Sequence, residues 1–356
     1  MISARQLYVL LAAALLTPAV RALPAWTAAT AGKGAWLTGL AAFPPLLAAG
    51  WVLARLLKGR SGGLAGAFQE ALGKTAGKGL TIIYVGWGLF LLCVEARLAG
   101  ERIRAAGYRG GSLAVFLVIL LGLTLWMGRR KLAAFARASE IFYLILMLAL
   151  GLVLVFSILD VTPENVLPVW VEDVPGVLAA TAVPVGVLSC GVFGAFLWGA
   201  VRPAGDSGRR GVRWLAWGCA LMALLQFGVL AQLGPKLSAM LESPFFEVAR
   251  GVGVRGAFQR VESVVVALWV LSDLALLGLL LFACRAMAGA VWGPKGEKWM
   301  PYLAAVAALA GALVLFPDKW TAKELAATII PLGNFLLALP VPGAVLLISR
   351  IRRGRR

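Results

Sequence analysis

One carboxylate lies deep within an apolar stretch of the chain. Asp273 follows Ser272 near the middle of residues 258–288, and Trp269 precedes both. An ionised carboxylate in apolar surroundings is so costly that it is paired, protonated or in contact with water. Ionisable residues at such positions are candidate functional residues. Two interpretations remain open for Asp273: pairing with an arginine, and a role at a ligand or cation site.

Two other apolar stretches contain residues that interrupt a helix. Proline removes a backbone donor and glycine lowers helical preference, so a helix can unwind there and free main-chain groups for a ligand. The interrupted segments are Thr17-Pro18-Ala19 in residues 6–24, and Pro184, Gly186, Ser189 and Gly191 in residues 175–200. Proline and glycine are also common in ordinary membrane helices. The stretch 327–349 is interrupted as well.

The sequence lacks the patterns typical of an enzyme, a metal site or a cofactor site. It has no histidine, and its four cysteines lie in apolar stretches without CxxC spacing. Residues 251–256 match the dinucleotide fingerprint GxGxxG, which needs a preceding strand and a soluble helix. Here they lead into an apolar stretch, so we interpret them as a chance match among 42 glycines. We expect no enzymatic activity, no metal and no cofactor.

These residues are positioned by apolar stretches of about twenty residues, long enough to cross a ~30 Å hydrocarbon layer. With 61% hydrophobic and 14% charged residues, the chain contains more apolar side chains than one buried core requires. Within lipid such segments are helices, because each backbone amide needs an internal partner. We therefore predict an all-α integral membrane protein with one domain over residues 1–356. Its ten predicted spans are 6–24, 35–56, 79–98, 112–128, 139–159, 175–200, 213–233, 258–288, 299–317 and 327–349.

The interrupted stretches are the first and sixth of the ten, which are corresponding positions in a five-plus-five inverted repeat. Many secondary transporters bind their substrate between two such broken helices. We therefore expect a small molecule to bind between spans 1 and 6, its carboxylate held by freed main-chain groups. The predicted side walls come from spans 3 and 8 and are Tyr84, Trp87, Trp269, Ser272 and Asp273. Arg260 and Glu262, at the start of span 8, are expected to form an orienting pair.

The formal charge of +18 lies mostly in the loops between spans, which favours contact with membrane lipid over nucleic acid. The basic loops predict that both termini face the cytoplasm, and the acidic loop 160–174 then faces outside. The basic loop after span 3 disagrees with this topology. Either Glu95 and Glu101 neutralise its arginines, or the predicted topology is wrong there.

Several short motifs resemble those of the B subunits of bacterial spore germinant receptors, the GerAB type. They occur in order over residues 2–269 and match the family's "IS-x-x-Q", "aWl", "aR-x-x-E-I", "NLLPV" and "P-x-x-E…R-x-E-s…W". The corresponding segments are Ile2–Leu7, Ala35–Leu37, Ala136–Ile141, Asn165–Val169, and Ser243–Phe245 with Arg260–Ser263 and Trp269.

The resemblance implies an amino acid/polyamine transporter-like (LeuT/APC-like) fold of ten helices. It also implies a role in sensing a germinant, commonly an amino acid, together with an A-type membrane subunit and a C-type lipoprotein. The chain departs from the family at two places. Thr17-Pro18-Ala19 stands where a glycine-rich break is usual, and span 6 contains no acidic residue, with Gly194-Ala195-Phe196 near its end. We expect an apolar pocket floor.

We therefore expect a germinant-sensing receptor subunit in the cell membrane or the spore inner membrane. The alternative is an amino-acid transporter of the same fold, with Ser272 and Asp273 as its ion or proton site. A third interpretation is a subunit that binds nothing and scaffolds its partners.

Overall fold

The structure is a computed structural model that describes residues 1–60, 62–105, 110–159, 161–202, 207–251, 261–316 and 318–354. The elements before the acidic loop are α1 (Ala4–Ala31), η1 (Gly32–Trp36), α2 (Leu37–Ala41), α3 (Phe43–Leu57), α4 (Gly63–Leu72), α5 (Lys74–Ala105), α6 (Leu113–Gly128) and α7 (Leu132–Leu159). Those that follow are η2 (Pro163–Asn165), η3 (Val171–Asp173), α8 (Val174–Ala180), α9 (Ala182–Ser189), α10 (Val192–Phe196), η4 (Trp198–Ala200), α11 (Ser207–Met240), α12 (Pro244–Gly251), α13 (Val261–Val314), α14 (Lys319–Ala327), α15 (Ile329–Ala338) and α16 (Pro340–Gly354).

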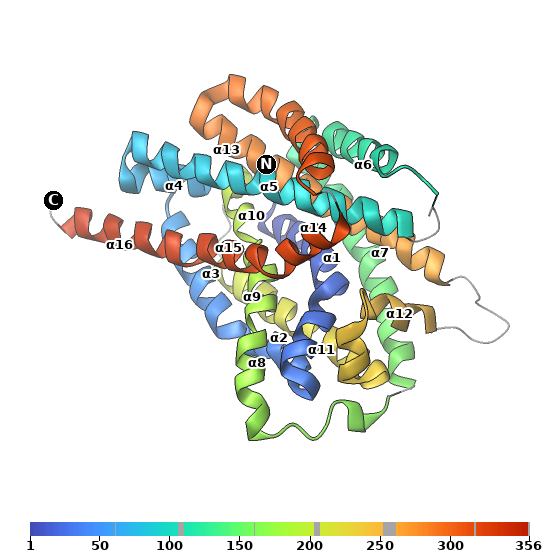
Figure 1. The fold of residues 1–356 in the computed structure, drawn as a ribbon. Coiled ribbons are helices and arrows are strands. Elements are labelled where there is room, and N and C mark those ends of the chain that lie inside the picture. Colours follow the sequence, from blue (N-terminus) through green and yellow to red (C-terminus); the bar gives the residue numbers. More distant parts are fainter. Residues whose placement is uncertain are drawn as a thin grey trace.

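Helices make up nearly all of the described chain, and Figure 1 shows them packed around α1, α9 and α13. Seven described stretches are long and apolar enough to cross a membrane, and α6 is a shorter apolar helix. They are Leu23–Leu57, Lys74–Ala105, Leu132–Val155, Val171–Phe196, Gly208–Met240, Trp269–Val314 and Trp320–Arg352. The predicted all-α membrane fold is therefore confirmed. The count of ten spans and the inverted repeat stay predictions.

Two of the long helices, α11 and α13, each change direction at an internal glycine. Gly234 in α11 and Gly293 in α13 have φ values of 72° and 73°, a left-handed conformation that glycine adopts without steric cost. A proline follows each glycine and prevents simple continuation of the helix. In Figure 1, α13 turns back on itself accordingly. The predicted spans 8 and 9 lie on either side of Gly293.

The first helix begins at a fixed point. Ser3 and Gln6 form a capping box, in which each side chain accepts a hydrogen bond from the other's backbone N–H at 3.0–3.1 Å. Ile2 also pairs with the end of span 6, because its N–H donates to Ala200 and its carbonyl accepts from Arg202, both at 2.9 Å. The start of α1 is thus joined to the end of span 6.

The prediction that span 1 unwinds is wrong. α1 runs without interruption from Ala4 to Ala31 and contains Pro18 and Pro24 within it. A membrane helix accommodates proline when neighbouring groups satisfy the freed backbone atoms. Span 6 is broken, as its prolines and glycines indicate, because it consists of α8, α9, α10 and η4.

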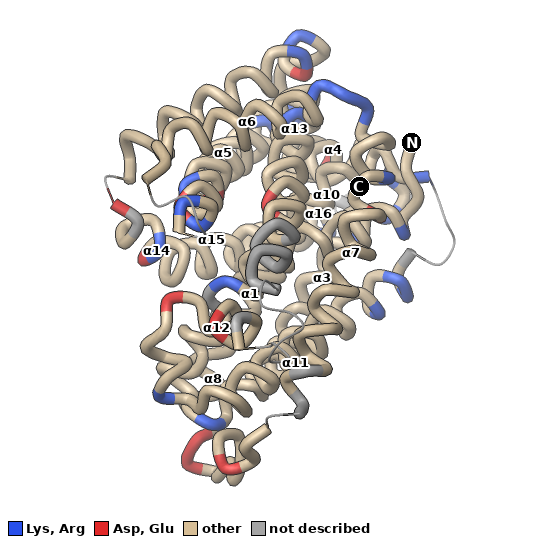
Figure 2. The backbone as a smooth tube through the Cα atoms, turned by 90° about the vertical axis from the view of Figure 1, so that its right-hand side faces the viewer, with Lys and Arg blue, Asp and Glu red and all other residues tan. Residues whose placement is uncertain are grey.

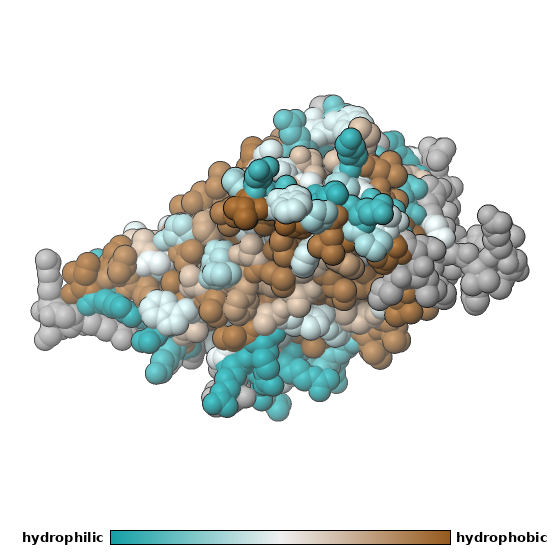
Figure 3. Space-filling view, turned by 90° about the horizontal axis from the view of Figure 1, so that it is seen from below, coloured by the Kyte–Doolittle hydropathy of each residue, from teal (hydrophilic) through white to brown (hydrophobic). Residues whose placement is uncertain are grey.

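The surface divides into apolar and charged regions. Figure 3 shows a broad hydrophobic face with hydrophilic groups at its margins. The exposed apolar side chains of α7 include Leu144, Leu148 and Val155, all more than half exposed. Figure 2 places the acidic segment that precedes α8 at the far end of the molecule from both termini. Outside the spans, a hydrogen bond from the Thr321 N–H lowers the pKa of Asp318, the N-cap of α14.

Two glycines of α5 provide a matched test of how α4 packs on it. A Cβ at Gly77 would lie 2.5 Å from the Gln69 Cα, whereas Gly79 is exposed with no atom within 4 Å of that position. We predict that Gly77→Ala lowers the free energy of unfolding by about 1–3 kcal/mol through overpacking. Gly79→Ala should be neutral or stabilising, because alanine favours the helix. Thermal unfolding in detergent measures both, and equal stability of the two variants would contradict this packing.

Candidate functional site

A serine of α13 bridges the backbone of α1 one turn before Pro18. The Thr17 N–H donates to Ser272 Oγ at 2.9 Å, and Ser272 Oγ donates to the Ala13 carbonyl at 2.6 Å. In a regular α-helix these two backbone groups bond to each other. Ser272 therefore satisfies both backbone groups in the helical turn that leads to Pro18. Two of the main-chain groups beside Pro18 are thus occupied by the protein itself.

Span 6 is interrupted by tight turns. Between α9 and α10, the N–H groups of Cys190 and Gly191 donate to the carbonyls three residues earlier, at 3.2 and 3.0 Å. This i→i+3 pattern is typical of a 3₁₀ turn. The break thus redirects the chain while those two amides remain paired.

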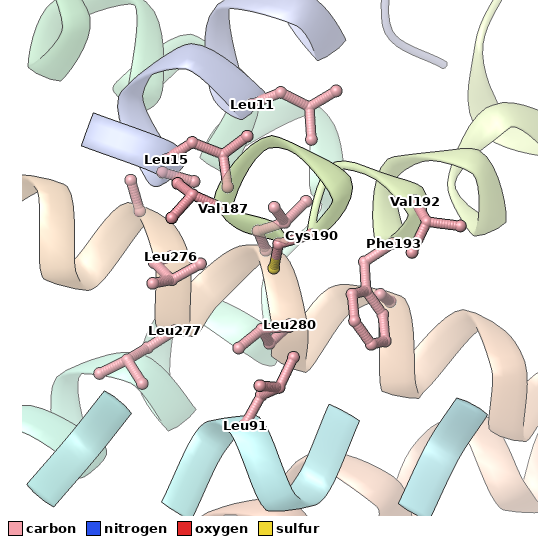
Figure 4. Packing of buried hydrophobic residues seen from close by; sticks show 14 of the residues in the cluster. Leu11, Leu15, Leu91, Val187, Cys190, Val192, Phe193, Leu276, Leu277 and Leu280 are labelled. Atoms are coloured by element: carbon pink, nitrogen blue, oxygen red, sulfur yellow. The ribbon is translucent and has the colours of Figure 1, made fainter. Parts of the chain in front are cut away.

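A small cavity of about 30 Å³, enough for about one water molecule, lies between the middle of α1 and the broken span 6. Its walls come from α1, α5, α9 with the following turn, α13, α14 and α15. The residues that line it are Pro18, Arg21, Trp26, Leu91, Glu95, Gly186, Val187, Cys190, Leu276, Leu280, Ala326, Ile330, Pro331 and Asn334. Figure 4 shows Val187 and Cys190 directed toward Leu276 and Leu280 of α13, with Leu91 of α5 beyond them. Most of the lining is apolar.

The charged wall of the cavity is an ion pair between α1 and α5. The Arg21 guanidinium donates to both carboxylate oxygens of Glu95, at 2.7 and 3.1 Å. Their side chains are 12% and 8% exposed. Such two-pronged pairs combine strength with a defined geometry. Arg21 lies late in predicted span 1, and the structure pairs it with a carboxylate late in predicted span 3. The opposite charges of Arg21 and Glu95, each late in its predicted span, could have indicated this pair.

An asparagine joins the break of span 6 to α5. Asn334 Nδ2 donates to the Gly186 carbonyl at 3.1 Å, and Asn334 Oδ1 accepts from Trp87 Nε1 at 2.9 Å. A Cβ at Gly186 would lie 2.2 Å from the Pro331 Cα, so α15 packs directly on α9. Sequence reasoning missed Asn334, although a lone amide in an apolar span was a signal.

The predicted site residues do not all meet at this cavity. Pro18 and Gly186 line it, and Trp87 is joined to it through Asn334. Ala19 lines a second, apolar cavity against α11, and a Cβ at Gly191 would contact Trp214 of α11.

Two buried hydroxyls, one beside Pro18 in α1 and one at the break of span 6, have no hydrogen-bond partner among the described residues. They are Oγ1 of Thr17 and Oγ of Ser189. Their side chains are only 2% and 3% exposed. Buried hydroxyls without partners are uncommon in folded proteins.

The other predicted wall residues have structural contacts. Tyr84 donates to the Leu337 carbonyl at 2.7 Å, and Trp269 stacks on Phe246 of α12 with ring centroids 5.3 Å apart. Asp273 pairs with Arg102, which selects the first of its two interpretations. Arg260 lies outside the described residues, as does the side chain of Glu262.

The arginines at the end of α5 are neutralised inside the protein. Glu101 pairs with Arg97 at 3.0 Å and Arg104 at 2.7 Å, and Asp273 pairs with Arg102. Arg97 also donates to the Phe316 carbonyl at 2.7 Å. Glu101 therefore acts as expected, whereas Glu95 pairs with Arg21. These contacts pair three arginines of the basic segment that disagreed with the predicted topology, whereas Arg109 lies outside the described residues.

Three aromatic rings pack together where α4, α5 and α10 meet. The ring of Tyr84 packs against Phe68 of α4 and Phe196 of α10, with centroids 5.5 and 5.1 Å away. Tyr84 and Phe68 are completely buried.

We predict that replacing either Arg21 or Glu95 alone destabilises the protein. Arg21→Gln or Glu95→Gln should lower the free energy of unfolding by about 3–5 kcal/mol, because each leaves a buried charge without its partner. The double variant Arg21→Gln/Glu95→Gln should lose less than the sum of the two. Thermal unfolding in detergent measures all three, and strictly additive losses would show that the two side chains do not interact.

Comparison with known sequences agrees with this architecture. A search of curated proteins finds no match. A family model described as "Spore germination protein" matches residues 1–315, which is most of the chain. The chain therefore belongs to the spore germination protein family, as the motifs of its first 269 residues indicated.

Proposed function

We propose that this protein is a sensing subunit of a spore germinant receptor and that the cavity between α1 and α9, about 30 Å³ in this conformation, widens to bind a small neutral amino acid. The observation that carries the proposal is the Arg21–Glu95 pair on the cavity wall. An amino acid carries one carboxylate and one ammonium group. Arg21 is the complement of the first and Glu95 of the second.

The ligand's carboxylate is thus held by a side chain and not by freed main chain of span 1, since Ser272 occupies those backbone groups. Asn334, with both sides already hydrogen-bonded, orients the wall beside Gly186. The remaining lining is apolar and includes Leu91, Val187, Leu276, Leu280 and Ile330. Such a lining favours a small apolar side chain on the ligand over a charged one.

Ligand binding would exchange the contact between α1 and α5 for contacts to the ligand. A ligand shifts a conformational equilibrium only by its differential affinity for the two states. Here the two states differ in the Arg21–Glu95 pair, which is formed in the absence of ligand and is open when the ligand is bound. The partners that read the resulting shift are proposed to be an A-type membrane subunit and a C-type lipoprotein.

The proposed architecture is the ten-span inverted repeat with both termini cytoplasmic. Three features of the chain support ten spans: α6 is a short apolar helix, α13 turns at Gly293, and α1 continues through η1 toward α3. The pairing of Arg97, Arg102 and Arg104 within the protein supports this topology, because these charges then need not face the cytoplasm.

The competing function is amino-acid transport by the same cavity. The sequence resemblance to transporters favours it, but Asp273 pairs with Arg102, and that pairing argues against a coupling-ion site there.

Adjacent isoleucines in α15 test the binding site. Ile330 lines the cavity and is 7% exposed, whereas Ile329 is 49% exposed. We predict that Ile330→Trp fills the cavity and raises the half-saturating amino acid concentration for germination at least tenfold. Ile329→Trp is the matched control and should respond normally. Both variants must assemble with their partners, and an unchanged response in Ile330→Trp would refute the proposed site and leave the scaffold interpretation.

Uptake into proteoliposomes separates the receptor from the transporter. We expect the purified protein to bind the amino acid without accumulating it, whether a proton or a sodium gradient is imposed. Gradient-driven accumulation that is abolished by Ile330→Trp and retained by Ile329→Trp would establish transport through the same cavity and contradict the pure receptor.

A further inference from the structure

Two guanidinium groups lie beside one exposed tryptophan. Trp51 of α3 is 49% exposed, with the Cζ atoms of Arg55 and Arg350 lying 5.1 and 5.9 Å from its ring centroid. Arg55 is on the same helix, and Arg350 belongs to α16, which packs against α3. Residues distant in sequence therefore form one basic-aromatic cluster, which we call the Trp51 cluster: Trp51, Arg55 and Arg350.

Neither arginine of the Trp51 cluster has a carboxylate within ion-pair distance among the described residues. Nearby basic residues are paired differently: Arg60 binds Glu70 at 2.7 Å, and Arg352 donates to the Ala71 carbonyl at 2.9 Å. Two like charges beside a single ring repel each other. An anion bound between them would remove that repulsion, so the cluster is complementary to a negative group.

The surface next to the cluster is apolar and arranged along the helices. On α3, Leu47, Trp51 and Arg55 are four residues apart and so share one face. On α16, Leu347 and Ile351 are exposed and lie three residues before and one residue after Arg350. The order along α3, from leucine through tryptophan to arginine, matches the order of acyl chain, interface and headgroup in a lipid leaflet.

We propose that the Trp51 cluster binds the headgroup phosphate of an anionic phospholipid, whose acyl chains lie along Leu47 and Leu347. The adjoining apolar face favours a lipid over a free anion in solution, since a free anion gains nothing from Leu47 or Leu347. The two arginines supply the charge, and the tryptophan holds them beside the headgroup. The site is separate from the cavity at Arg21 and Glu95.

Native mass spectrometry of the purified protein with phosphatidylglycerol, and with phosphatidylcholine, tests this site. Each positive charge near an anionic leaflet contributes about 1 kcal/mol, which is a roughly fivefold change in affinity. Arg55→Gln and Arg350→Gln should each weaken phosphatidylglycerol retention about fivefold, and the double variant should lose one bound lipid. Arg55→Lys/Arg350→Lys keeps the charge and should retain most of it.

Arg137→Gln is the matched control, because Arg137 is an exposed arginine whose Nε donates only to the Ala133 carbonyl of its own helix. It should leave phosphatidylglycerol retention unchanged, and phosphatidylcholine should bind all variants equally. An unchanged lipid count in the double variant, or an equal loss in Arg137→Gln, would overturn the proposal. Thermal unfolding of each variant in detergent confirms that a lost lipid does not reflect a lost fold.

Discussion

Three buried polar contacts join α1, α5 and α13 pairwise, and the site depends on them. Arg21 and Glu95 join α1 to α5, Ser272 joins α13 to α1, and Asp273 pairs with Arg102 to join α13 to α5. In a bilayer no water satisfies such groups, so each must find its partner within the protein. Adjacent residues of α13 thus hold two different helices. This arrangement places the cavity where charges are costly to leave unpaired, and so makes it sensitive to a charged ligand.

The same constraint explains why the break of span 6 remains ordered. Its turn amides bond within the chain, and Asn334 binds the Gly186 carbonyl one turn before the break. The close approach of Pro331 to Gly186 leaves no room for a side chain at that position. A rigid wall of this kind positions a ligand against Arg21 and Glu95 better than an unwound loop would, because less of it must be ordered on binding.

Sequence reasoning predicted the features that depend on composition. The apolar stretches established a helical membrane protein, the prolines and glycines of span 6 predicted its interruption, and Pro18 and Gly186 do line a common cavity. It failed where the outcome depends on a tertiary partner. Whether Pro18 unwinds its helix is decided by Ser272, some 250 residues later, which only the packed fold brings to Ala13. Glu95 and Asp273 likewise pair with arginines. The sequence pattern does not specify how deep these arginines lie or in which direction their side chains extend.

The central claim is that Arg21 and Glu95 bind the two charges of one amino acid. Equilibrium binding of an amino acid that triggers germination, compared with its methyl ester and its N-acetyl derivative, tests this claim most directly. The account predicts that the zwitterion binds and that both derivatives, each lacking one charge, bind at least tenfold more weakly. Equal affinity for either derivative would contradict it, because one of the two side chains would then contribute nothing to recognition.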